Sequence, residues 1–165
     1  MSVPSLVQRA ARLGLSLTAA LAFLAPLLTR LTVGYAFLLT GRGKLLDLAT
    51  FTGFLRDELH VPFAAAQAPF IAGLEFVGGI ALILGIATRL FGAGLLATML
   101  VAILTAERTD FVSAWLPTTE KGPLDIAPYV FFLLLSWLVL YGPGPLSLDK
   151  LLSRWLGLGD PQVAK

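Results

Sequence analysis

Three ionisable residues lie within or beside long apolar runs of this chain: Glu75, Arg30 and Lys44. Glu75 is placed inside the run from residue 67 to residue 99. An ionised carboxylate in hydrocarbon is unfavourable unless it is paired, so such a residue is by default either a buried structural partner or a functional group. We therefore take Glu75 as a candidate catalytic intramembrane carboxylate, with Arg30 and Lys44 as its candidate partners.

The end of the first apolar helix decides which cation lies near Glu75. Residues equidistant from the connecting segment share a depth in an antiparallel hairpin. If the first helix ends near Thr40, a rise of about 1.5 Å per residue places Arg30 within about one turn of Glu75. If the helix continues to Leu46, Lys44 moves towards Glu75 and Arg30 moves away. The sequence leaves both partners open.

Two roles fit such a pair. In a structural role, Glu75 and a basic partner form a buried polar bond that fixes helix register, as buried ionic groups sometimes do. In a functional role, Glu75, Arg30 and Lys44 line a polar cavity, where a carboxylate can exchange a proton or hydrogen-bond a quinone carbonyl or hydroxyl group. Glu75→Ala would damage the protein in either case. Glu75→Gln separates the two roles better, because it keeps the shape and removes the charge.

Composition indicates a membrane protein. Of the 165 residues, 57% are apolar and 13% are charged, whereas soluble domains have roughly 45 to 50% and about 25%. An apolar stretch of about 18 residues suffices to cross a hydrocarbon layer roughly 30 Å thick, and this chain has room for four. The sequence therefore predicts an all-α fold, an integral membrane four-helix bundle with short interfacial helices, as a single domain over residues 1–165.

The scarcity of reactive side chains excludes several kinds of chemistry. The chain has no cysteine, so it cannot perform thiol–disulfide exchange, ligate an iron–sulfur cluster or use a cysteine nucleophile. Its one histidine, His60, cannot provide both ligands of a bis-histidine haem, and a zinc site would lack its usual ligands. We expect no metal site and no redox centre. The net charge of +2 with scattered basic residues argues against a nucleic-acid partner.

Four spans are predicted, at about residues 21–40, 69–87, 90–106 and 124–141. The glycines of Gly41–Lys44 are expected to end or bend the first span, and an amphipathic helix between Leu45 and Pro62 is expected to lie on the membrane. The second and third spans are expected to form a tight hairpin around Thr88 and Arg89. Residues 107–123 read as a polar loop that contains Trp115 and several breakers.

The two chain ends carry further interfacial signals. Leu13–Thr18 is expected to lie along the membrane interface before the first span. Asp125 opens the fourth span, where an acid complements the helix dipole. Ser147 can cap a short amphipathic helix that includes Asp149.

Basic residues give the orientation. An even number of spans puts both termini on one side of the membrane. The basic residues on that side would be Arg9, Arg12, Arg89, Lys150, Arg154 and Lys165, and those opposite would be Arg42, Lys44, Arg56, Arg108 and Lys121. The positive-inside rule therefore favours cytoplasmic termini in a multi-pass protein of the inner, or cytoplasmic, cell membrane.

Arg30, Lys44 and Glu75 belong to a larger set of residues that occur in a fixed order along the chain. In chain order the set is Arg30, Gly34, Phe37, Gly41, Lys44, Glu75, Gly78, Gly79, Gly85, Thr88, Arg89, Met99 and the run GPGPLSLD at 142–149. This set, over about residues 30–152, resembles the DoxX family of DoxX- and DoxD-like proteins. The resemblance implies a bacterial or archaeal four-helix membrane protein. Family members include the small membrane subunits of a thiosulfate:quinone oxidoreductase, and others are linked to oxidative-stress or respiratory assemblies.

Three functions follow from the residues and the resemblance together. The first is a membrane-embedded accessory or quinone-interacting subunit of a redox complex, with protein partners in that complex, quinone as the possible cofactor and no covalently bound group. The second is a stand-alone quinone-dependent oxidoreductase. The third is a small transporter or proton pathway centred on Glu75.

Overall fold

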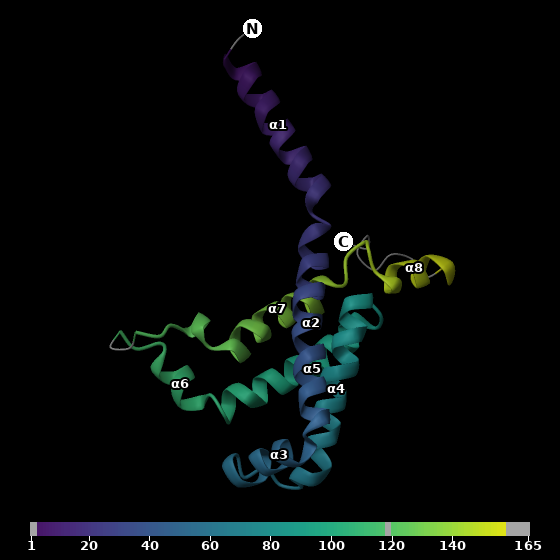
Figure 1. Cartoon of the computed structure of the whole chain (residues 1–165). Coiled ribbons are helices and arrows are strands. Elements are labelled where there is room, and N and C mark those ends of the chain that lie inside the picture. The colour runs from purple at the N-terminus through teal and green to yellow at the C-terminus, as the bar shows by residue number, and fades with distance from the viewer. Residues whose placement is uncertain (1–2, 118–119, 158–165) are drawn as a thin grey trace.

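The structure is a computed structural model that describes residues 3–117 and 120–157, and every regular element in these ranges is helical (Figure 1). The helices are α1 (Val3–Leu21), α2 (Leu24–Leu46), α3 (Leu48–Gly53), α4 (Ala64–Leu84), α5 (Thr88–Leu104), α6 (Arg108–Ser113), α7 (Ala127–Tyr141) and α8 (Leu148–Trp155). A π-helical turn (Phe54–Glu58) follows α3, and a 3₁₀ turn (Pro123–Asp125) precedes α7. The prediction of an all-α fold is confirmed.

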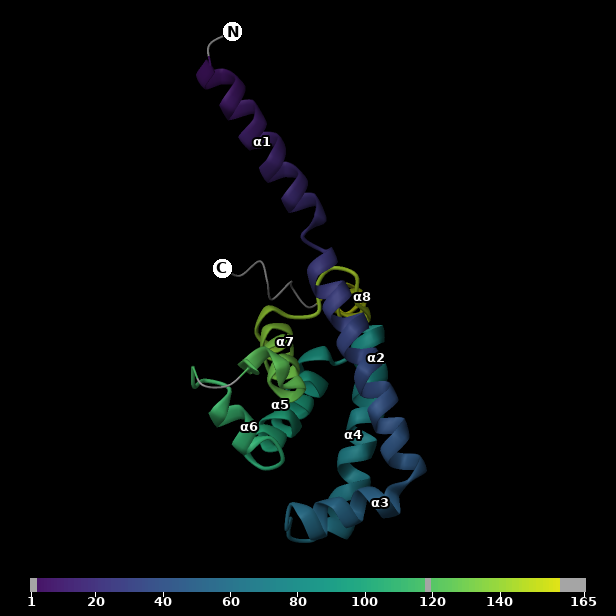
Figure 2. The same cartoon turned by 60° about the vertical axis from the view of Figure 1, so that its left-hand side comes forward.

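The long helices form two pairs. α2 packs along α4, and α5 packs along α7. Figures 1 and 2 show that the α5–α7 pair runs steeply away from the α2–α4 pair. The second and third apolar segments are joined by a short turn, but it lies at residues 85–87 and not around Thr88 and Arg89, which begin α5. The axes of α4 and α5 diverge, and these helices share a smaller contact than α2 and α4 do.

Glycines let α2 and α4 approach closely. A Cβ atom added at Gly79 would lie 2.5 Å from the Leu38 nitrogen and 2.7 Å from the Gly34 oxygen. One added at Gly41 would collide with the backbone of Phe76. The expectation that Gly41–Lys44 ends or bends the first span is therefore wrong: Gly41 is a contact point with α4, and α2 continues to Leu46.

One apolar core joins α2, α4, α5 and α7. Its members are all at most 3% exposed: Val33 and Phe37 of α2, Leu82 of α4, Leu95 of α5, and Leu135 and Leu138 of α7. Phe37 also packs on Phe131 of α7, with ring centroids 5.4 Å apart. Packing in this core holds the α5–α7 pair against the α2–α4 pair.

Of the two longer connecting segments, the one between Leu45 and Pro62 is helical, as expected, and the one over residues 107–123 differs from the expected loop. The segment between Leu45 and Pro62 forms α3 and the π-helical turn, and Leu55 of that turn packs on Ala64 and Ala68 of α4. Residues 107–123, predicted to be a loop, contain α6, where Phe111, Trp115 and the α7 residue Tyr129 form a ring cluster.

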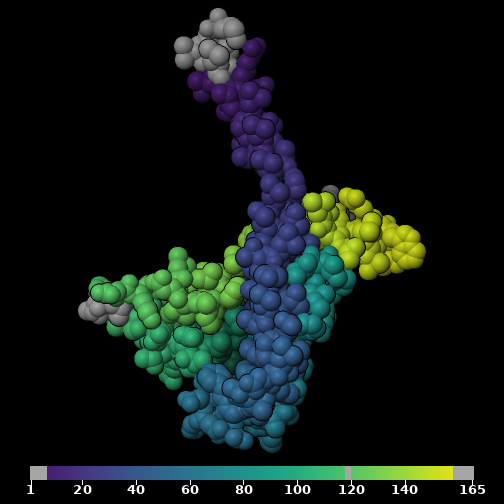
Figure 3. All heavy atoms as spheres, in the orientation of Figure 1, coloured from purple at the N-terminus to yellow at the C-terminus, as the bar shows by residue number. Residues whose placement is uncertain are grey.

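Helix α1 projects from the rest of the molecule (Figures 1–3). Its side chains from residue 7 onward are exposed. By length and composition two helical stretches can cross a membrane, Val7–Leu46 and Ala64–Leu84. α5 and α7 are also apolar but have only 17 and 15 residues.

Candidate functional site

Lys44 is the candidate cation that contacts Glu75. The Lys44 Nζ atom lies 2.6 Å from Glu75 Oε1, and it also lies 4.7 Å from the centre of the Phe51 ring of α3. Glu75 is 2% exposed, whereas the Lys44 side chain is 30% exposed. The pair forms because α2 continues to Leu46, the later of the two helix ends that the sequence left open.

The second carboxylate oxygen of Glu75 has no partner in the part of the chain that the structure describes. Buried polar atoms are almost always hydrogen-bonded to protein or to ordered water. Oε2 can accept a hydrogen bond when the carboxylate is ionised and can donate one when it is protonated. The geometry therefore leaves a strong hydrogen-bonding atom without a partner between α2 and α4.

Arg30 lies at the other end of the α2–α4 interface, with only 2% of its surface exposed. Its guanidinium donates four hydrogen bonds to backbone carbonyls: Nε to Leu82 (3.0 Å), Nη1 to Pro143 (2.7 Å) and Leu146 (2.9 Å), and Nη2 to Ile83 (3.3 Å). The acceptors belong to the last turn of α4 and to the segment between α7 and α8. Arg30 therefore joins three chain segments and does not pair with Glu75.

Asp149 completes the structure around Arg30. Its Oδ1 accepts from the Ala87 amide at 2.6 Å and its Oδ2 from the Thr88 amide at 2.9 Å, while its own amide donates to the Gly85 oxygen at 2.8 Å. The carboxylate thus satisfies amides at the start of α5, which carry the positive end of the helix dipole. It also holds Ala87 at a left-handed φ of 44°.

Sequence reasoning did not find this role of Asp149. The sequence assigns Asp149 to the short C-terminal helix and to the end of the run at 142–149, without a partner for its carboxylate. The predicted cap of that helix is confirmed, since Ser147 Oγ accepts from the Lys150 amide at 3.1 Å. The available signal is that Asp149 ends the GPGPLSLD run at 142–149, which belongs to the ordered set that resembles the DoxX family. The partners lie 61 and 62 residues away, so the sequence alone does not indicate them.

The other ionisable residues singled out lie at exposed positions. His60 is exposed at a φ of 53°. Asp125 Oδ2 accepts from the Gly122 amide at 2.7 Å at the turn before α7. In the π-helical turn, hydrogen bonds from Arg56 lower the pKa of the Asp57 carboxyl.

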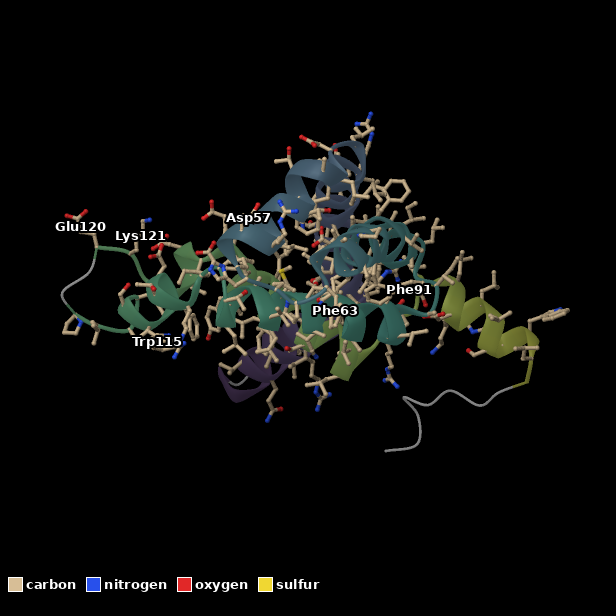
Figure 4. All side chains as sticks on the ribbon, turned by 90° about the horizontal axis from the view of Figure 1, so that it is seen from below. Asp57, Phe63, Phe91, Trp115, Glu120 and Lys121 are labelled. Atoms are coloured by element: carbon tan, nitrogen blue, oxygen red, sulfur yellow. The ribbon has the colours of Figure 1, made fainter. Side chains whose placement is uncertain are left out.

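Figure 4 shows Asp57, Trp115, Glu120 and Lys121 on the outer parts of the molecule, away from its centre. Within residues 3–117 and 120–157, no group of three or more His, Cys, Asp or Glu side chains could hold a metal ion.

The candidate site residues lie inside a segment that matches a protein family. The DoxX family model matches residues 25–108, a range that includes Arg30, Lys44, Glu75 and Thr88. The match stops short of residue 152, to which the resemblance in the sequence extends. The chain has no significant match among curated proteins or among solved structures. Since the match covers more than half of the 165 residues, the chain belongs to the DoxX family of membrane proteins.

Proposed function

We propose that this protein is an accessory, quinone-interacting subunit of a membrane redox complex, and that the Lys44–Glu75 pair is its quinone site. The observation that carries the proposal is Glu75 Oε2, a buried oxygen without a partner in the described residues. A quinone headgroup carries polar oxygens on an apolar ring. It can therefore hydrogen-bond to Glu75 Oε2 while its ring contacts apolar side chains of the helices.

Each oxidation state of a quinone has a partner in this pair. A quinol hydroxyl group can donate to Glu75 Oε2, and a quinone carbonyl can accept from the Lys44 ammonium group or from a protonated Glu75. Lys44 is 30% exposed at the end of α2, so protons can reach the buried carboxyl from that end. The electrons would come from the redox centre of a partner subunit, and this chain would supply binding and proton transfer.

The proposal includes a four-span arrangement in which α2, α4, α5 and α7 all cross the membrane. At about 1.5 Å per residue, α5 and α7 measure about 25 and 22 Å, which a locally thinned bilayer accommodates. α3 and α6 would then lie at one membrane face, and α1 and α8 at the other. We place the face with α1 and α8 in the cytoplasm of a bacterial cell. Most of the basic residues that the sequence assigns to the side of the termini lie at this face, and the positive-inside rule favours the cytoplasm for that side.

The first test is native mass spectrometry of the untagged protein, extracted from its own host in mild detergent, with bound quinone identified after release. We expect a stoichiometric protein partner and quinone. Glu75→Gln should lose the quinone while keeping the partner, and Glu120→Gln, at an exposed position on the arm after α6 (Figure 4), should lose neither.

This measurement, together with a turnover assay on the purified chain, separates the proposal from the alternative functions. Quinone reduction by the purified chain alone would favour a stand-alone oxidoreductase. A chain with neither partner nor quinone would overturn the proposal and favour a transporter or proton pathway centred on Glu75.

A further inference from the structure

A cleft lies between α8 and the adjoining ends of α2 and α4. It has a volume of about 530 Å³. Its apolar wall is formed by Leu27, Ile83, Leu84 and Leu151. Three basic residues also line the cleft: Lys150 and Arg154 of α8, and Arg30 of α2. Figure 3 shows α8 standing out beside the body at this place.

Charge is strongly segregated between the two ends of the molecule. Among described residues, the end with α1, α8 and the α4–α5 turn carries Arg9, Arg12, Arg30, Arg89, Lys150 and Arg154, with Asp149 as its acid. The end with α3 and α6 carries eight carboxylates, Asp47, Asp57, Glu58, Glu75, Glu107, Asp110, Glu120 and Asp125, and five basic residues, Arg42, Lys44, Arg56, Arg108 and Lys121. The Asp149 carboxylate is already bonded to the Ala87 and Thr88 amides. The cleft therefore has a net positive charge.

Helix α8 has the character of a helix at a membrane surface. Its apolar side chains are exposed: Leu151 by 62%, Leu152 by 53% and Trp155 by 82%. Asp149, Lys150, Ser153 and Arg154 form the polar remainder of the same two turns. Such a helix lies in the interface with its apolar face towards the acyl chains, and tryptophan is enriched at that depth. Its basic residues then lie at the level of lipid phosphates.

We propose that this cleft binds one anionic phospholipid. Arg154 holds the phosphate, and an acyl chain lies along Leu27, Ile83 and Leu84. Arg30 contributes mainly its positive charge, because four of the five N–H groups of its guanidinium already donate to carbonyls. The apolar wall favours a lipid over a free anion, since a soluble phosphate gains nothing from contact with leucine and isoleucine side chains.

The bound lipid would also stabilise the structure around Arg30. The cleft residues Pro145 to Leu148 belong to the segment whose carbonyls accept from Arg30, and Arg154 lies on the helix that this segment precedes. A ligand that contacts both α8 and α4 holds these two helices together. Because it binds only the folded state, it raises the stability of the folded protein.

The test is native mass spectrometry of delipidated protein titrated with phosphatidylglycerol or with phosphatidylcholine of the same acyl chains. We expect preferential retention of one phosphatidylglycerol. A basic residue near an anionic surface contributes about fivefold in affinity, so Arg154→Gln should weaken retention about fivefold. Arg108→Gln, at an exposed position on α6, is the matched control and should have no effect. Leu84→Asn should weaken retention while leaving the helical content unchanged.

Three results would overturn the proposal. Equal retention of phosphatidylcholine would show that the basic groups do not select the lipid. Equal effects of Arg154→Gln and Arg108→Gln would show that only overall charge matters. Displacement of phosphatidylglycerol by millimolar inorganic phosphate would identify a site for a soluble anion.

Discussion

Lys44 Nζ of α2 lies 2.6 Å from Glu75 Oε1 of α4, so one ion pair joins two helices across 31 positions of sequence. Removal of one member of a buried pair leaves an uncompensated charge, whereas replacement of both members by apolar residues is often tolerated. This asymmetry separates a pair that only holds helices together from one that binds a ligand.

We expect Lys44→Ala to lower the free energy of unfolding by about 3 kcal/mol, at the lower end of the range for buried pairs, because Lys44 keeps 30% exposure. The measurement is thermal or denaturant unfolding in detergent. The double variant Lys44→Met/Glu75→Leu should recover most of the loss. It should nevertheless bind no quinone if Glu75 Oε2 is the ligand position.

Arg42→Ala is the control, since Arg42 is exposed on the same part of α2. If Lys44→Ala and Arg42→Ala have the same effect, the pair does not contribute to stability.

Arg30→Lys should be strongly destabilising although it keeps the charge. A lysine ammonium cannot span acceptors on two chain segments as the guanidinium does. Leaving two buried carbonyls unpaired lowers stability by about 2–4 kcal/mol. The same unfolding assay checks this, with Arg12→Lys of the exposed helix α1 as the control. A value below about 1 kcal/mol would mean that water replaces these bonds.

Asp149→Asn should loosen the first turn of α5. The asparagine amide nitrogen is a donor and cannot accept from the Ala87 or Thr88 amide that the lost oxygen served. Loss of a helix cap lowers stability by about 1–2 kcal/mol. Hydrogen exchange should accelerate at residues 87–91, and Asp110→Asn, at an exposed position, should leave that exchange unchanged. Unaltered protection there would contradict the assigned role.

Alanine substitutions at glycines should distinguish the α2–α4 contact from the open faces of the same helices. An added methyl group meets backbone at Gly79 and at Gly41, whereas nothing lies within 4 Å at Gly73 or Gly43. Gly79→Ala and Gly41→Ala should each lower stability by about 1–3 kcal/mol or more. Gly73→Ala and Gly43→Ala should be neutral or raise it by up to about 1 kcal/mol. Similar effects at all four positions would argue against the observed close approach.

Local patterns in the sequence were sufficient for several features. The 57% apolar content and the long apolar runs indicated a helical membrane protein, and the family match agrees with that conclusion. Glu75 was identified because a carboxylate within an apolar run is rare at any position. The Ser147 cap was found because its signal is contained in four consecutive residues.

Only the tertiary structure decided which groups meet. Gly41 is read locally as a helix end, but close packing on Phe76 keeps α2 helical as far as Leu46, and that extension brings Lys44 to Glu75. Arg30 and Asp149 bond to backbone groups, and any residue type provides these, so the sequence carries no mark of their partners. The divergence of the α5–α7 pair from the α2–α4 pair depends on how side chains of four helices fill one core, which no single segment encodes.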